Sequence, residues 1–466
     1  MRKVLLVTYT FPPQYDVSAR RALKLCKYLP AAGWQPVVLT KNWMTDIAPE
    51  DRRAYTLASF PQALDEIPGV NVIRTPYRTR DNALRRLHQR LGGVYDASMR
   101  SNEGTTRHDG TETSFSPRSV ARRALSLFSP AFGDFPDPFR GWVDAAIDEG
   151  VRVIRDESIE AICSLCPPAS AHVVGSEIAR VTGVPWVAQF DDLYSFHLER
   201  QRRAVWRPYA DRQHRRWMSQ AAAAGAITPA MLAYIQRTYG VDGEVVMVGF
   251  DPAEQPLVEP EHHDRLRLAY TGSVYPGDQR PELFFEALDR VVAARGTNPP
   301  PIEVTFAGTG CDRSLEESLS RFPDAARACV FIDRLPPADA LRLQRRADGL
   351  VLFNCTAPTA AEGTLSFPAK TFEYLNAGRP ILALPSDPGG WGDALLERTR
   401  AGVTADSVEG IAAVLEAWLR TWERGLPLAY TGDRSEIARY SQPRQAGALA
   451  RLLDRAVVSR STVVDR

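Results

Sequence analysis

The sequence lacks any apolar run that approaches the roughly 18–20 residues of a membrane-spanning helix. It also lacks an excess of charge of one sign, because 57 basic residues stand against 56 acidic ones. The resulting net charge of +1 excludes a generic nucleic-acid binder on bulk charge. Cysteine is scarce, with six residues scattered over 466, and the apolar start of the chain ends at Pro12-Pro13 without a small-residue cleavage site. We therefore expect reduced thiols and a cytoplasmic protein.

The alternation of strand and helix patterns indicates the fold class. The chain is too long for one ordinary core, since domains usually hold about 100–200 residues. Residues 3–8 form a short apolar run, residues 20–29 carry apolar side chains at helical spacing, and residues 36–40 form a second apolar run. This βαβ pattern predicts a parallel sheet, and a second series of the same kind runs from residue 266 to residue 384.

We therefore expect an α/β protein with two doubly wound, Rossmann-like domains that face each other across a cleft, with ligands at the carboxyl ends of the strands. The segment 251–264 holds three prolines and no apolar periodicity, which is typical of a linker. The expected first domain covers 1–250 and holds a variable insertion over 77–140, which is mobile over 98–119. The linker covers 251–264 and the second domain covers 265–430. Terminal helices cover 431–466, and packing back on the first domain is one option for them.

One predicted helix carries a candidate anion site. Ser366 suits its N-cap, Pro368 its first turn, and Gly378 the position after its last turn. Lys370 and Glu373 lie three residues apart near its start. Free N–H groups, the positive end of the helix dipole and a lysine would together cradle a diphosphate, and a glutamate can accept hydrogen bonds from two ribose hydroxyls. The alternative is an exposed Lys–Glu pair that stabilises the helix by about 0.3 kcal/mol.

The stretch Pro-Ala-Lys-Thr-Phe-Glu-Tyr-Leu-Asn-Ala-Gly-Arg-Pro, residues 368–380, strongly resembles the donor-site helix of family-four glycosyltransferases of the GT-B type. Further segments are similar to motifs of that family and follow in the expected order: 10–13, 166–172, 183–192, 249–251, 270–275 and 306–310. Each match is weak alone, but their order makes the resemblance specific. It covers most of the chain outside 77–140.

The resemblance implies transfer of a sugar from a nucleotide-sugar, of the UDP or GDP type, to an acceptor hydroxyl with retention at the anomeric carbon. It implies no cofactor and no obligatory metal, which agrees with the absence of any Asp-x-Asp sequence in the chain. The first domain would bind the acceptor and the second the nucleotide-sugar. An acceptor glycan, a lipid-linked sugar or a small metabolite would all fit.

The resemblance also assigns roles on the donor side. Lys370 matches the family's phosphate lysine and Glu373 its ribose-binding glutamate. Arg280 is the candidate second phosphate cation, although a solvated arginine at a helix start is an equal alternative. Glycines would let the backbone approach the nucleotide, and two residues after the next strand would line the base. These and the remaining donor-side candidates are Gly272, Gly308, Gly310, Arg334, Leu335, Phe367 and Pro368.

Five residues of the first domain are candidates on the acceptor side. Gln14 and Tyr15 lie in the stretch 14–18, which replaces the glycine-rich turn usual in the family. His172 is a catalytic candidate that would bind donor or acceptor hydroxyls, or else an ordinary histidine on a helix surface. Asp191 and Asp192 follow a strand, where they would bind acceptor hydroxyls or cap a turn.

Two features keep other interpretations open. The family often carries two glutamates with seven residues between them, and Leu365 occupies the first position if Glu373 is the second. A sugar-nucleotide epimerase or pseudo-glycosyltransferase of the same fold, or a catalytically silent nucleotide-sugar-binding protein, is therefore an alternative. The segment from Arg200 to Arg216 holds seven arginines and Trp206. It is a solvated face or a peripheral contact with the inner face of an anionic membrane.

Overall fold

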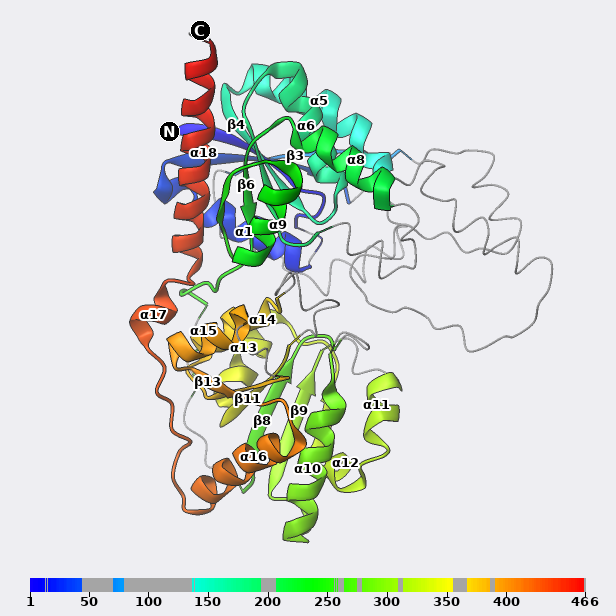
Figure 1. Ribbon diagram of the computed structural model, residues 1–466, viewed down its shortest axis with the longest axis vertical. Coiled ribbons are helices and arrows are strands. Elements are labelled where there is room, and N and C mark those ends of the chain that lie inside the picture. Colours follow the sequence, from blue (N-terminus) through cyan, green and yellow to red (C-terminus); the bar gives the residue numbers. More distant parts are fainter. Residues whose placement is uncertain are drawn as a thin grey trace, which may run out of the picture. The chain divides into compact units, whose positions relative to one another are not determined.

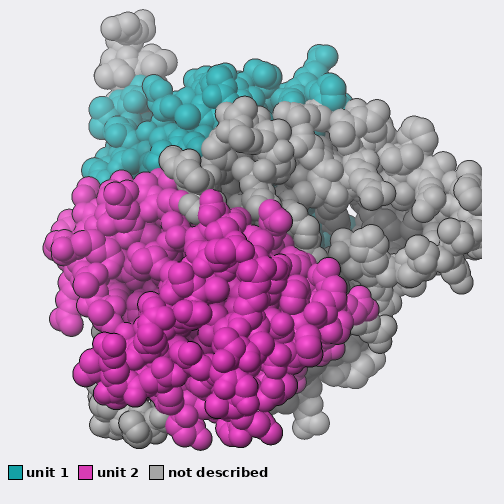
Figure 2. All heavy atoms as spheres, turned by 60° about the horizontal axis from the view of Figure 1, so that its bottom comes forward, with its two compact units in different colours: residues 1–102, 106–247, 445–466 teal, residues 103–105, 248–444 magenta. Residues whose placement is uncertain are grey.

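The chain forms two compact units in the computed structural model (Figure 2). The first unit holds the described residues up to Met247 and from Gln445 onward, and the second holds those of Val248–Arg444. The structure describes residues 1–12, 14, 16–43, 70–78, 136–137, 139–193, 207–254, 256, 258, 264–274, 279–308, 313–354, 367–385 and 390–464.

The first unit is built on a parallel sheet with strand order β3-β2-β1-β4-β5-β6-β7. Its central strands are buried along most of their length, which explains their continuous apolar runs. The strands are β1 (Arg2–Val7), β2 (Trp34–Lys41), β3 (Asn71–Thr75), β4 (Ile159–Cys166), β5 (Trp186–Phe190), β6 (Ala221–Ala226) and β7 (Gly243–Val245).

Helices cover both faces of this sheet (Figure 1). On one face, α1 and α18 pack apolar side chains such as Leu25 and Leu449 against Leu6 and Val38. On the other face, α5 and α6 pack so closely that a Cβ on Gly150 would lie 2.3 Å from Ile178 Cδ1 and 3.1 Å from Leu39 Cδ2. The helices are α1 (Val17–Tyr28), α5 (Val143–Asp156), α6 (Ser170–Thr182), α8 (Arg207–Met218), α9 (Pro229–Tyr239) and α18 (Gln442–Val464), with 3-10 turns η1 (Pro30–Ala32) and η3 (Arg140–Trp142).

The second unit is built on a parallel sheet with strand order β10-β9-β8-β11-β12-β13. The strands are β8 (Leu266–Thr271), β9 (Ile302–Ala307), β10 (Cys329–Ile332), β11 (Gly349–Phe353), β12 (Ile381–Leu384) and β13 (Gly402–Thr404). One face is packed against α10, α11, α12 and α16, and α13 and α14 lie on the other. The helices are α10 (Pro281–Arg295), α11 (Arg313–Leu319), α12 (Pro323–Ala328), α13 (Pro337–Arg346), α14 (Lys370–Ala377), α15 (Trp391–Thr399), α16 (Val408–Glu423) and α17 (Arg434–Ala438).

The predicted class, an α/β protein with two doubly wound parallel sheets, is confirmed. The sequence analysis grouped 431–466 as terminal helices, with packing back on the first domain as one option. Helix α17 belongs to the second unit, whereas α18 packs on the first. The described residues of the expected linker, 251–264, fall within the second unit. Most of the expected insertion over 77–140, namely residues 79–135, lies outside the described residues.

Within the part of the chain that the structure describes, no helix is long and apolar enough to cross a membrane.

The contact between α18 and the first sheet gives a direct test of the packing. Leu449 is fully buried in the core of the first unit, so Leu449→Ala should lower the free energy of unfolding by about 2–5 kcal/mol through lost burial and a cavity. Val458, on the same helix, is 63% exposed, and Val458→Ala should change it by less than about 0.5 kcal/mol. Urea unfolding followed by tryptophan fluorescence measures both. Equal effects of the two variants would contradict the packing of α18.

Candidate functional site

The second sheet reverses its strand order beside β8, and this is where ligands bind in doubly wound folds. Gly272 follows β8 at φ +99°, and Gly308 follows β9 at φ +153°. The two loops nearly touch, because a Cβ on Gly308 would lie 2.6 Å from the Gly272 carbonyl oxygen. A side chain at either position would be strained and would fill the space at this edge of the sheet.

Lys370, the first residue of α14, lies directly against this loop. Its Nζ donates hydrogen bonds to Tyr270 Oη at 2.5 Å and to the Ser273 carbonyl at 3.2 Å. The same ammonium lies 3.9 Å from the centroid of the Tyr270 ring, which attracts a cation. Tyr270 is fully buried, and its hydroxyl donates to Ser273 O at 2.7 Å. These contacts hold the positive charge at the carboxyl end of β8.

Glu373, one turn further along α14, is oriented by a glutamine from the neighbouring helix α13. Gln344 Nε2 donates to Thr271 Oγ1 at 2.9 Å and to Glu373 Oε2 at 3.3 Å. The hydroxyl of Tyr374 accepts a hydrogen bond from the Thr271 N–H at 2.8 Å, so β8, α13 and α14 share one network. Lys370 and Glu373 are both half-buried and tied to other elements. They are therefore more than an exposed ion pair on one helix.

The other donor-side candidates are less closely involved. Arg334 is exposed and Leu335 half-buried, directly after β10. The Phe367 ring packs edge-on against Trp391, and the Pro368 carbonyl accepts from the Thr371 N–H. Arg280 is exposed at the N-cap of α10, and within the described residues its side chain makes no polar contact. Gly310 and Leu365 lie outside the described residues.

In the first unit, His172 lies in the first turn of α6 and is only 4% exposed. Its Nδ1 is 2.7 Å from Ser164 Oγ, which accepts a hydrogen bond from Trp186 Nε1 at 2.8 Å. His172 Nε2 is buried without a hydrogen-bond partner in the described part of the chain. Burial lowers the pKa of His172 to about 3. The alternative of an exposed histidine on a helix surface is therefore wrong.

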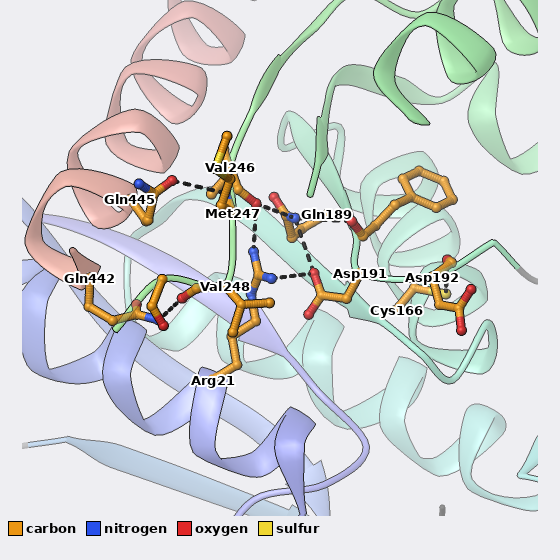
Figure 3. A network of polar contacts seen from close by, with 12 residues as sticks. Arg21, Cys166, Gln189, Asp191, Asp192, Val246, Met247, Val248, Gln442 and Gln445 are labelled. Atoms are coloured by element: carbon orange, nitrogen blue, oxygen red, sulfur yellow. Dashed lines mark hydrogen bonds and ion pairs between the residues drawn. The ribbon is translucent and has the colours of Figure 1, made fainter. Parts of the chain in front are cut away.

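Asp191, after β5, is part of a buried polar network (Figure 3). Arg21 is 2% exposed, and its Nη1 lies 2.7 Å from Asp191 Oδ1 while its Nη2 donates to the Val246 carbonyl at 2.9 Å. Gln189 Nε2 donates to the same carboxylate oxygen at 3.2 Å. Burial raises the pKa of Asp191 to about 6, against the opposing effect of Arg21. The Oδ1 of Asp192 accepts a hydrogen bond from the N–H of the next residue, Leu193, at 2.8 Å.

The remaining acceptor-side and membrane candidates are only partly described. Gln14 is 6% exposed, and its N–H donates to the Phe11 carbonyl, whereas Tyr15 lies outside the described residues. Of the arginine-rich segment, residues 207–216 form most of α8, and 200–206 lie outside the described residues. The side chains of Arg215 and Arg216 are exposed, which fits either the solvated face or the membrane contact.

Residues that the sequence analysis missed hold the candidates in place. Tyr270 and Gln344 fix Lys370 and Glu373, Ser164 binds His172, and Arg21 binds Asp191. Arg21 left a signal as an arginine on the apolar face of a predicted helix, and Tyr270 is the first residue of the segment 270–275. The other contacts join elements that are distant in the sequence.

No family model matches the chain, and no curated protein matches it. Solved structures do. HepE from Anabaena, in complex with UDP and glucose, resembles it with a TM-score of 0.52 at 13% identity, over 100% of this chain and 98% of that one. The sucrose-phosphate synthase of Thermosynechococcus elongatus gives 0.53 at 12%, over 100% and 98%. The lipopolysaccharide outer core galactosyltransferase WaaB gives 0.50 at 11%, over 98% and 99%.

The chain has the GT-B fold. At 11–13% identity the likeness establishes the fold and leaves the chemistry to the residues of the site.

The buried histidine predicts a pH dependence of stability. Its pKa is about 3 in the folded state against an ordinary 6.5, so between these values the unfolded state binds more protons. The stabilisation is complete above pH 6.5 and is lost as the pH falls toward 3. His172→Gln should therefore flatten the slope of unfolding free energy against pH between pH 6 and pH 4, by up to about 1.4 kcal/mol per pH unit. Urea midpoints across this range measure it.

Ser176→Ala is the matched control, because Ser176 is buried in the same helix and does not titrate. It should lower stability equally at every pH. Parallel slopes for wild type and His172→Gln would show that His172 is not held neutral by burial.

Proposed function

We propose that the protein is a glycosyltransferase that moves a sugar from a UDP- or GDP-type nucleotide-sugar to an acceptor hydroxyl, with retention and without a metal or cofactor. The observation that carries the proposal is the position of Lys370. Its ammonium lies at the N-terminus of α14, beside the glycine loop after β8, where the sheet reverses its strand order. HepE, which has the same fold, binds UDP and UDP-glucose.

This arrangement suits a diphosphate that must leave. The Lys370 ammonium and the positive end of the α14 dipole would stabilise the negative charge that develops as the sugar–phosphate bond breaks. The ammonium is already fixed by Tyr270 and Ser273, so little reorganisation is needed when the charge appears. Gly272 leaves space beside the ammonium, because a Cβ there would lie 3.1 Å from Lys370 Nζ, and Gly308 lets its loop pack against Gly272.

Glu373 would select the nucleoside part of the donor. Its carboxylate is one turn from Lys370, a spacing that suits a ribose beside a diphosphate, and Gln344 holds one of its oxygens. A carboxylate can accept hydrogen bonds from ribose hydroxyls. Arg334 and Leu335 follow β10, the edge strand beside β9, where they would line the base.

The first unit would supply the acceptor side. His172 and Asp191 both belong to the carboxyl-end region of its sheet, with Asp191 directly after β5 and Ser164, the partner of His172, on β4. An acceptor glycan, a lipid-linked sugar or a metabolite each remains compatible with this region. A lipid-linked acceptor would suit a membrane contact through the arginines of α8. Cytoplasmic location stays a prediction of the sequence.

Nucleotide binding tests the proposal. In a thermal-shift panel of UDP, GDP, ADP, dTDP and their sugars, the nucleotides of one base should stabilise the wild-type protein. At one hundred times the dissociation constant the stabilisation should be about 2.7 kcal/mol. Lys370→Ala should weaken this binding about ten- to a hundredfold, because a hydrogen-bonded charge is lost. Glu373→Ala should weaken it as well. Lys3→Ala, which removes a lysine of the first unit bound to Glu157, should leave binding unchanged.

Turnover separates the alternatives. A glycosyltransferase releases nucleoside diphosphate in proportion to glycosylated acceptor, whereas an epimerase changes the sugar while it stays on the nucleotide. A silent binding protein gives a thermal shift with no product. If no nucleotide stabilises the wild type, the proposed donor site is wrong.

A further inference from the structure

We propose that Ser164 and Trp186 are positioning residues that hold His172 as a neutral imidazole with its proton on Nε2. His172 would then donate one hydrogen bond to an oxygen of a bound substrate and would not act as a general base. The assignment of the proton rests on the hydrogen bonds alone, whereas the substrate half rests on the proposed function.

The proton assignment follows from counting donors. The indole Nε1 of Trp186 can only donate, so Ser164 Oγ accepts that hydrogen bond at 2.8 Å. The serine hydroxyl has one proton of its own, and His172 Nδ1, at 2.7 Å, is its remaining partner among the described residues. A donating hydroxyl requires a lone pair on Nδ1. In a neutral ring the proton then lies on Nε2.

The opposite tautomer satisfies fewer groups. If Nδ1 donated to Ser164, the serine proton would have no acceptor, because an indole N–H offers none. His172 Nε2 would also be an acceptor without a donor. The first arrangement leaves only the Nε2 proton unpaired. Buried polar groups are almost always paired in native structures, so the tautomer with fewer unpaired groups is favoured.

The packing around the ring preserves this geometry. His172 lies edge-on to Phe190 at 4.4 Å and to Trp186 at 5.8 Å between ring centroids. Gly175, one turn along α6, leaves room for the indole: a Cβ there would lie 2.6 Å from Trp186 Nε1 and 3.1 Å from Ser164 Oγ. A glycine in the middle of a helix costs about 1 kcal/mol relative to alanine, and here it lets Trp186 reach Ser164.

The unpaired Nε2–H defines the ligand chemistry. A buried donor without a partner costs about 1–3 kcal/mol, and an acceptor oxygen placed against it recovers that free energy. A sugar hydroxyl, ring or phosphoryl oxygen provides such an acceptor. Burial keeps the ring neutral at physiological pH, and Ser164 occupies its lone pair, so His172 has no free basic nitrogen.

Long-range proton–nitrogen NMR of ¹⁵N-histidine-labelled protein tests the tautomer without any substrate. His172→Gln identifies the His172 signal, which should report a protonated Nε2 and an unprotonated Nδ1. Ser164→Ala should convert it to a mixture of tautomers, and Ser164→Thr should restore it. A wild-type signal protonated at Nδ1, or one insensitive to Ser164→Ala, would overturn the proposal.

Enzyme kinetics with the nucleotide-sugar that stabilises the protein test the donor role. His172→Gln keeps an N–H donor and should retain kcat/KM within about tenfold, whereas His172→Leu should lose about tenfold more. The pH profile between pH 6 and pH 8 should be the same for wild type and His172→Gln. Equal losses of kcat/KM in His172→Gln and His172→Leu, or a pH profile of His172→Gln that differs from that of wild type, would exclude the donor role. A protein that binds no nucleotide-sugar would refute the proposed function and leave the NMR result to decide the tautomer.

Discussion

Both sheets are parallel and both reverse their strand order, beside β1 in the first unit and beside β8 in the second. At such a point the two connections leave toward opposite faces, and the carboxyl ends of adjacent strands are left open. Every candidate that the structure ties into a network lies there or on the next strand end. Gly272 follows β8, Lys370 and Glu373 lie on the helix after β11, and His172 lies on the helix after β4. The strand order therefore determines where the candidate residues lie.

Buried polar contacts at the edge of the first sheet also fix the segments by which the chain leaves and re-enters this unit (Figure 3). Arg21 donates to the Val246 carbonyl, and the next N–H, of Met247, donates to Gln445 Oε1 at 2.9 Å. The carboxylate of Asp191 compensates the charge of Arg21. Removing one partner of such a pair leaves an uncompensated buried charge, at a cost of about 3–5 kcal/mol. Asp191 therefore stabilises the first unit through Arg21, and any role in acceptor binding must be compatible with this contact.

Much of the fold could be predicted from the sequence because apolar runs and helical spacing are local signals. Residues 3–8 and 36–40 match β1 and β2 closely, and Gly378 indicated the end of α14. The predicted start of α14 is wrong, because its N-cap is Ala369 without a side-chain cap and Pro368 precedes the helix. The packing of α18 on the first sheet was only one option from the sequence, because its partners, such as Leu6 and Val38, are more than 400 residues away. The candidate site shows the same division. Lys370 and Glu373 stood out by type and spacing, whereas Tyr270 and Gln344 matter only through contacts across the fold.

Lys370 in the second unit and His172 in the first unit have opposite electrostatic surroundings, although both units have the same architecture. In the second unit the ammonium of Lys370 lies among a ring face, a hydroxyl and a carbonyl, each of which attracts a positive charge. In the first unit the surroundings of His172 are apolar rings and a serine already engaged by Trp186, so a charged imidazole has no compensation. A leaving diphosphate needs the charge, and a hydroxyl needs only a directed hydrogen bond. The difference between a cation held by acceptors and a histidine held neutral is what would let one unit bind the phosphate while the other orients an uncharged oxygen.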